Sequence, residues 1–281
     1  MIGRELVLSK WEDIELLGLD KRARMYRGQR DASWPLRSSI ERCCDQHSIA
    51  PAERKSFEQR VFREFRRGYH QYTAQLPSHD WSLEWFSLMQ HHGAPTRLLD
   101  FTYSIFVAMY FGLYESSKTD ACIWSVDAVW AYQASVGLLC NGGKPDAAAL
   151  PQLWTESDEV VAGAIVFNDP QVRMVWPVNP FRLNERLRIQ KGLFLAPGDI
   201  SLTLMENMAA LPDHNVDDHV VRIVVPRALR ESALHRLFHM NISHTSLFPG
   251  LDGYAQSLGV YHPTINKPIN WLDGATLRAK A

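Results

Sequence analysis

Residues 90–102 hold the densest group of side chains in the sequence that could take part in chemistry. The segment joins an adjacent histidine pair, a Gly-Ala-Pro turn, Arg97 and Asp100, and a strongly apolar run follows it directly. A polar group beside apolar surroundings is costly unless it has a partner. We therefore expect Arg97 and Asp100 either to pair with each other and brace the segment or to contact a ligand.

The most basic stretch of the chain, residues 21–30, is a second candidate site. It contains one lysine and four arginines, among them Arg27, which stands directly before Gly28. A guanidinium presents a planar fork that suits phosphate, and a glycine lets a ligand approach the backbone closely. The stretch is either an anion site or, as is common for charge runs, a solvated loop.

The helix expected at residues 51–75 carries a second basic face, formed by Arg60, Arg63 and Arg67. The usual interpretation of such a face is a solvated helix surface, and the alternative is a surface for nucleic acid or a protein partner.

Several common catalytic patterns do not occur in the sequence. No Gly-x-Gly-x-x-Gly follows an expected strand, and Gly-Lys-Ser/Thr, Gly-x-Ser-x-Gly and His-Glu-x-x-His are missing. A metal site built from His91, Asp100 and His244 is conceivable, but neighbouring histidines on a helix point apart and the spacing does not favour it. We therefore expect no metal cofactor.

Composition places the chain among ordinary soluble globular proteins. It has 281 residues, 46% of them hydrophobic and 22% charged. The formal net charge of -1 gives no global attraction to nucleic acid or membrane, so any such contact needs a local patch.

The four cysteines and the apolar segments indicate a cytoplasmic protein with free thiols. There is no Cys-x-x-Cys pattern, and Cys43 and Cys44 are adjacent, a poor arrangement for a metal or a disulfide. The N-terminal residues lack the pattern of a signal peptide. The longest apolar run, residues 98–114, is too short and too polar for a membrane span, so no membrane partner is expected.

Hydrophobic periodicity and turn residues predict helices mainly in the first half of the chain and strands mainly in the second. The expected helices cover residues 9–17, 51–75, 82–91, 103–115 (capped by Asp100 or Thr102) and 227–238, with a short one after Gly253. The expected strands cover residues 25–29, 120–127, 164–167, 172–176, 189–195 and 220–225. This order predicts a single α+β domain over residues 1–281 rather than a regular βαβ alternation, with a variable helical insertion at residues 128–162.

Four blocks of the sequence together resemble the FRG domain family, which is named for an aromatic-Arg-Gly motif. They are Tyr26-Arg27-Gly28-Gln29, the segment 90–102, Arg188-x-Gln190-x-Gly192-x-Phe194 and the segment 247–253. They occur in the family's order and span most of residues 20–260. His92 and Phe101 replace the Tyr and Trp that the family often has, and Gly250 stands where an acid is common.

The resemblance implies a relation to divergent ADP-ribosyltransferases of bacterial toxin and phage-defence systems, with a mixed or antiparallel β core. NAD would be the substrate, a macromolecule the acceptor, and a neutralising antitoxin protein the partner. The basic stretch at residues 21–30 and the basic helix face at Arg60 to Arg67 favour RNA or DNA as that acceptor. In such enzymes the nicotinamide bond breaks through an oxocarbenium-like state that nearby anionic or hydrogen-bonding groups stabilise.

By this resemblance the expected catalytic residues are Arg27, Asp100 and Gln190. The expected NAD-binding residues are Tyr26, Arg27, Gly28, Gln29, His91, Thr96, Arg97, Gly192 and Phe194, with Tyr26, His92 or Phe194 as rings that stack. No Glu-x-Glu or Gln-x-Glu pair marks a late catalytic acid, which leaves Asp100 as the best-placed carboxylate; Glu231 and Asp252 are weaker candidates.

Two other functions remain open from the residues. One is a non-catalytic module that binds nucleic acid or nucleotides through the same arginines, with affinity that falls steeply with salt. The other is a metal-independent nuclease or phosphoesterase that uses His91 and Asp100.

Overall fold

Seven strands form one mixed sheet in the computed structural model, which describes residues 3–20, 22–73, 77–78, 81–115, 118–141, 169–180, 184–212 and 216–260. The strand order is β1-β7-β4-β2-β3-β6-β5. The β1–β7 pair is parallel and the other pairs are antiparallel. The strands are β1 (Arg4–Val7), β2 (Arg24–Gln29), β3 (Leu99–Thr102), β4 (Ala121–Asp127), β5 (Val175–Val178), β6 (Gly192–Pro197) and β7 (Val220–Val225).

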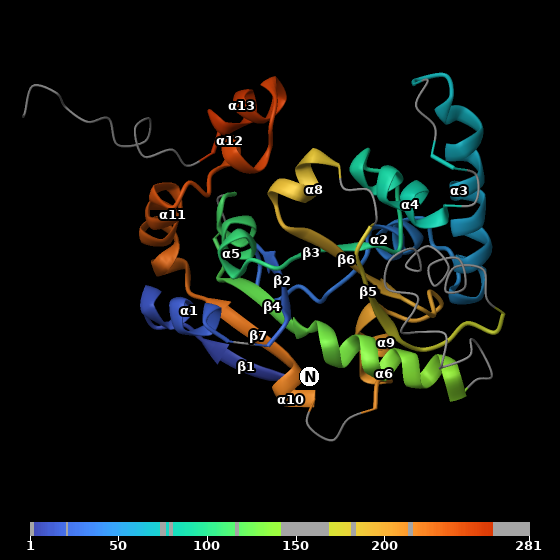
Figure 1. The fold of residues 1–281 in the computed structure, drawn as a ribbon, viewed down its shortest axis with the longest axis horizontal. Coiled ribbons are helices and arrows are strands. Elements are labelled where there is room, and N and C mark those ends of the chain that lie inside the picture. The colour runs from blue at the N-terminus through green and yellow to red at the C-terminus, as the bar shows by residue number, and fades with distance from the viewer. Residues whose placement is uncertain are drawn as a thin grey trace, which may run out of the picture.

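Helices cover both faces of this sheet, which confirms the expected α+β class (Figure 1). The first half of the chain supplies α1 (Trp11–Gly18), α2 (Ser39–Gln46), η1 (Pro51–Glu53), α3 (Arg54–Tyr69), α4 (Ser82–His91) and α5 (Ile105–Leu113). The second half supplies α6 (Ala128–Asn141), α8 (Glu185–Ile189), α9 (Leu204–Ala209), α10 (Val216–His219), η3 (Arg227–Leu229), α11 (Arg230–His239), α12 (His244–Leu247) and α13 (Leu251–Ser257).

The two sides of the sheet have separate apolar cores. On one side α1, α5 and α11 pack against Tyr26, Ile123 and Ile223. On the other side α3, α4, α6 and α9 pack against Met25 and Trp124. Figure 1 shows α3 and α4 on the side of the molecule away from α1 and α11. Side chains of β2 and β4 contact the two cores alternately, because successive side chains of a strand point to opposite faces of the sheet.

Most expected elements occur, with shifted ends, but the segment 90–102 is not simply a loop. Its last residues form β3, which pairs with β2 and β6. Neither Asp100 nor Thr102 caps the following helix: the Ser104 hydroxyl accepts the hydrogen bond from the Val107 backbone N–H, at 3.3 Å. The expected insertion begins as α6, and residues 142–168, with the strand expected at 164–167, lie outside the described residues.

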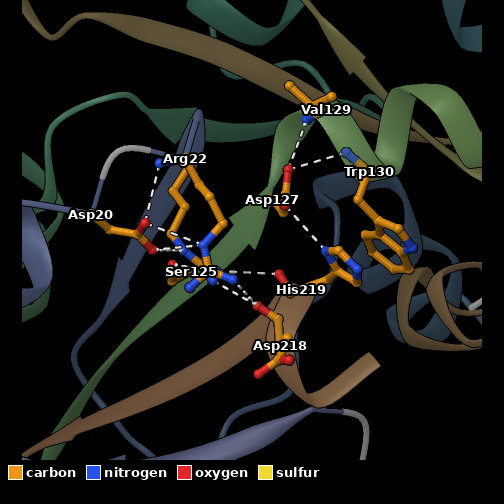
Figure 2. Close-up of polar contacts among 9 residues, drawn as sticks. Asp20, Arg22, Ser125, Asp127, Val129, Trp130, Asp218 and His219 are labelled. Carbon is orange, nitrogen blue, oxygen red and sulfur yellow. Dashed lines mark hydrogen bonds and ion pairs between the residues drawn. The ribbon is translucent and has the colours of Figure 1, made fainter. Parts of the chain in front are cut away.

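Arg24 and Asp127 tie β2 and β4 to the segment around α10. Arg24 is 6% exposed and donates to Asp20 and to the carbonyls of Asp218 and His219. Asp127 accepts hydrogen bonds from the backbone N–H groups that begin α6 and lies 3.1 Å from His219 Nδ1 (Figure 2). The contacts of this cluster give hydrogen-bond partners to the polar groups buried at one end of the sheet. Because Arg22 and Arg24 take part in them, these two side chains do not contribute to the anion site expected at residues 21–30.

Two cysteines of the core carry thiols that resist ionisation. Cys44 and Cys122 have no exposed surface, and burial raises the pKa of each thiol to about 11. A raised pKa means that the folded protein holds the proton more tightly than the unfolded chain does. The contribution to stability is therefore complete below the unfolded pKa, near 9, and is lost as the pH rises toward 11.

We expect the free energy of unfolding to fall by roughly 2 kcal/mol per buried thiol between pH 8 and pH 10.5. Urea unfolding of the wild type and of Cys122→Val across this range measures the slope. The variant should lose part of the decrease, and Cys43→Val, which replaces a neighbouring cysteine that is only half-buried, is the control. Equal slopes for the wild type and Cys122→Val would contradict the account.

No helix among the described residues is both long enough and apolar enough to cross a membrane.

Candidate functional site

A cleft of about 810 Å³ opens between β2, β3, the end of α5, α8 and the α12–α13 segment. Figure 1 shows α8 near α12, at the end of the molecule where α13 also lies. The volume falls within the roughly 300–1,000 Å³ of small-molecule sites. Its walls combine cations with aromatic rings. The cations are Arg27, Arg30, Arg37, Arg42 and Arg186, and the rings are Tyr26, Trp34, Phe101, Phe111, Tyr114 and Phe248.

Positive charge exceeds negative charge in this cleft. Arg30 pairs with Glu115, and Arg37 pairs with two acids of α2. Within the described part of the chain, Arg42 and Arg186 form no ion pair: Arg42 donates to the Arg37 carbonyl, and Arg186 lies over an aromatic ring. Cations held together without carboxylate partners attract an anionic ligand.

Arg27 is the cation nearest the centre of the sheet. Its Nη1 donates to the Asp100 carbonyl at 2.8 Å and lies 4.0 Å from the Asp100 carboxylate. Its buried Nε has no hydrogen-bond partner among the residues that the structure describes. Burial lowers the pKa of the Arg27 guanidinium, Asp100 opposes that shift, and the like charge of Arg42 adds to it. Arginine nevertheless stays protonated in proteins. An anion bound here would offset both the burial and the repulsion between Arg27 and Arg42.

A short hydrogen-bond chain holds the carboxylate of Asp100 in place. The Thr96 hydroxyl donates to Gln90 Oε1 at 2.6 Å, which leaves the Gln90 amide nitrogen to donate to Asp100 Oδ2 at 2.9 Å. Thr96 itself has no exposed surface, so the expectation that it binds a cofactor is wrong. Its contribution is to fix the orientation of Gln90, and through it one oxygen of Asp100.

The wall opposite β3 is a stack of planar groups. The Arg186 guanidinium lies 4.6 Å from the Phe248 ring centroid, and the His244 ring stacks against the same phenyl ring at 4.3 Å. His244 is buried, and its Nε2 lies 3.4 Å from Gln256 Oε1. Its Nδ1 has no hydrogen-bond partner within the described part of the chain. Burial lowers the pKa of His244, so its imidazole is neutral near pH 7.

The structure brings six of the eleven expected site residues to the cleft. The lining includes Tyr26, Arg27, Gly28, Gln29, Asp100 and Gln190, and it does not include His91, Thr96, Arg97, Gly192 or Phe194.

Arg97 is the clearest departure from expectation. Its guanidinium is 1% exposed and pairs with Glu58 of α3, which is fully buried, and it also donates to the Pro197 carbonyl at 3.2 Å. Asp100 instead receives its hydrogen bond from Gln90 and faces Arg27. The expected pairing of Arg97 with Asp100 and the cofactor contact of Arg97 are therefore both wrong.

Two glycines make room for helices rather than for a ligand. A Cβ on Gly28 would lie 1.8 Å from the Ala108 carbonyl oxygen, so α5 packs directly on this strand. A Cβ on Gly192 would lie 2.3 Å from a methyl carbon of Leu187 in α8. Phe194 is 2% exposed within the core, where it cannot stack on a bound base. Gly28 still lines the cleft, although its missing Cβ makes room for α5, whereas the ligand roles predicted for Gly192 and Phe194 are corrected.

Gln190 and His91 lie near the cleft in other roles. The Gln190 side-chain amide donates to the Leu247 carbonyl at 3.0 Å, which joins α8 to the end of α12. His91 is exposed and its ring contacts the ring of His92 edge-on. Burial lowers the pKa of His91, and His92 and Arg186 lower it further. Among the described residues no three His, Cys, Asp or Glu side chains are grouped so that they could hold a metal ion.

The residues that sequence reasoning missed come from distant segments. Arg42 lies on α2, which the sequence did not predict, and Arg186 lies on α8 four residues before Gln190. Phe248 belongs to a block that carried the family resemblance, which is the one signal that could have placed it at the site. Trp34 and Glu115 carry no such signal.

Residues 22–121 match the family model of the FRG domain, a span of just over a third of the chain. The span runs from the segment before β2 into the start of β4 and includes Arg27, Gly28 and Asp100. No curated protein and no solved structure matches the chain.

Proposed function

We propose that the cleft binds NAD and that the protein transfers ADP-ribose from it to a macromolecular acceptor. The single observation that supports the proposal most strongly is the cleft itself: Arg27 and Arg42 both line it and repel each other, without a tight carboxylate partner among the described residues and beside several aromatic rings. Two adjacent cations suit a pyrophosphate, and rings suit the planar bases on either side of it. The resemblance to ADP-ribosyltransferases supplies the reaction class.

The proposed reaction needs little from the protein beyond positioning and charge. The bond between C1′ of the ribose and the nicotinamide nitrogen breaks, and its electron pair leaves with nicotinamide. An acceptor oxygen or nitrogen forms the new bond to C1′ and gives up its proton. Asp100, whose carboxylate lines the cleft and is held by Gln90, would stabilise the positive charge that develops on the sugar.

The proposed neutralising antitoxin partner comes only from the resemblance. RNA or DNA as the proposed acceptor comes from the basic stretch at residues 21–30 and the basic helix face at Arg60 to Arg67. The alternative with His91 and Asp100 as a nuclease pair receives no support from the cleft, because His91 is not part of its lining. The non-catalytic nucleotide-binding alternative uses the same arginines, and nicotinamide release separates it from the proposal.

Arg27→Ala is expected to weaken NAD binding by roughly 10- to 100-fold, which corresponds to the loss of charge-assisted hydrogen bonds to phosphate. Isothermal titration calorimetry with NAD and with ADP-ribose measures the change. Arg63→Ala is the matched control, because Arg63 is exposed on α3 and does not line the cleft. Unchanged affinity in Arg27→Ala would show that the phosphates lie elsewhere.

A further inference from the structure

Trp34 is an aromatic side chain at the cleft that the proposed NAD site does not require. It is 43% exposed, whereas the neighbouring cleft ring Tyr26 is 6% exposed and Phe101 is 3% exposed. Trp and Arg are enriched among the side chains that contribute most to the binding of a partner. The position of Trp34 beside the arginines of the cleft is therefore a candidate contact for a partner.

Hydrogen bonds hold the segment that carries Trp34 rigidly. The Gln29 side-chain amide donates to the Pro35 carbonyl at 3.2 Å, and its oxygen accepts from Trp124 Nε1 at 2.8 Å. The Ala32 backbone N–H donates to the Asp120 carbonyl at 2.7 Å. A ring held out toward solvent on a braced segment loses little conformational entropy when a partner stacks on it.

The charges around Trp34 favour a polyanion. The Arg30 guanidinium lies 5.1 Å from the Trp34 ring centroid, and Arg30 lines the cleft with Arg37 and Arg42. Arg42 is exposed on α2 and has no ion pair in the described part of the chain. An exposed indole ring next to arginines is the combination that single-stranded nucleic acid uses, with a base on the ring and phosphates on the cations.

We propose that Trp34 is the stacking platform for the acceptor, and that the acceptor is single-stranded nucleic acid. This inference rests on the proposed function for its link to ADP-ribose transfer. A base stacked on Trp34 would bring its neighbouring nucleotides to the mouth of the same cleft in which Asp100 lies. A paired duplex, with its bases stacked on each other, would not expose a base to the ring.

The test compares wild type and Trp34→Ala for binding of fluorescein-labelled oligonucleotides of about 12 nucleotides, the size range of single-strand sites. We expect single-stranded RNA or DNA to bind the wild type more tightly than the duplex of the same sequence. Trp34→Ala should weaken single-strand binding by roughly 5- to 150-fold, the loss expected for one stacked base. Trp34→Phe should recover most of that loss, and Tyr72→Ala, which removes an exposed ring from another surface, should cause none.

Calorimetry with NAD on the same variants distinguishes a failure of the role proposed for Trp34 from a failure of the proposed function. The loss of oligonucleotide affinity in Trp34→Ala should exceed the loss of NAD affinity by at least about fivefold. Equal losses would overturn the inference, because Trp34 would then belong to the dinucleotide site. Unchanged oligonucleotide binding, or equal affinity for duplex, would also overturn it. If the wild type releases no nicotinamide from NAD while the oligonucleotide results hold, the proposed function fails and the nucleic-acid site stands.

Discussion

Asp100→Asn should release nicotinamide from NAD about 100- to 1,000-fold more slowly than the wild type, with a much smaller change in the Kd for NAD. The substitution keeps the shape of the side chain and an oxygen that can accept the hydrogen bond from Gln90. It removes the negative charge and turns one acceptor oxygen into an NH2 donor. A group whose charge stabilises the transition state affects the chemical step rather than the binding of the substrate.

The geometry at Asp100 provides two further comparisons for this experiment. Gln90→Leu keeps the Asp100 carboxylate but removes the amide that donates to it. Its rate of nicotinamide release should therefore lie between those of the wild type and Asp100→Asn. Asp252→Asn changes an exposed carboxylate of α13 and should leave the rate unchanged. Liquid chromatography of nicotinamide at saturating NAD gives all four rates. An Asp100→Asn rate equal to that of the wild type would remove this carboxylate from the proposed mechanism.

Arg97→Met should lower the free energy of unfolding by about 3–5 kcal/mol. The substitution leaves the Glu58 carboxylate with no exposed surface and without its guanidinium partner, and an unpaired buried charge is among the most destabilising changes in a protein. The pair joins α3 to the segment that leads into β3. Its loss should therefore also loosen the loop that carries Thr96 and, through Gln90, Asp100.

A double-mutant cycle separates the free energy of the Arg97–Glu58 ion pair from the cost of the cavity that each substitution leaves. Arg97→Met with Glu58→Leu should recover much of the stability lost in Arg97→Met alone, because no buried charge remains. Arg67→Met, which breaks the exposed Arg67–Glu64 pair, should cost less than about 1 kcal/mol. Urea unfolding measures each variant. A loss in Arg97→Met no larger than that in Arg67→Met would contradict the structural role of Arg97.

The strongly patterned elements could be predicted from the sequence, and the contacts between distant segments could not. β7 occupies the expected residues 220–225 and β4 begins within one residue of expectation, because their apolar runs mark buried strands. β2 also begins within one residue of expectation, where a short run ends at Gly28. β3 has four residues, and its pairing with β6 joins segments about 90 residues apart. No local pattern in the sequence encodes such a pairing.

The cleft residues follow the same rule: local motifs could be identified from the sequence, and contacts between distant segments could not. Arg27 and Asp100 could be selected from the sequence because each lies in a compact motif, and both line the cleft. Arg97 was misassigned because Asp100 is its nearest acid in the sequence, whereas the folded chain pairs it with Glu58, 39 positions away. Gly28 was correctly identified as a position of close approach, but the neighbour is the backbone of α5 rather than a ligand.

Release of nicotinamide from NAD is the decisive measurement for the proposed transferase activity. The purified protein is incubated with NAD labelled in its adenosine part, with single-stranded RNA or DNA as acceptor, and both nicotinamide and labelled acceptor are followed over time. We expect nicotinamide to form and label to move to the single strand. Arg27→Ala and Asp100→Asn should suppress both nicotinamide release and labelling of the acceptor. NAD that binds but stays intact with RNA, DNA and protein acceptors alike would contradict this expectation, and the cleft would then be a binding site without transferase activity.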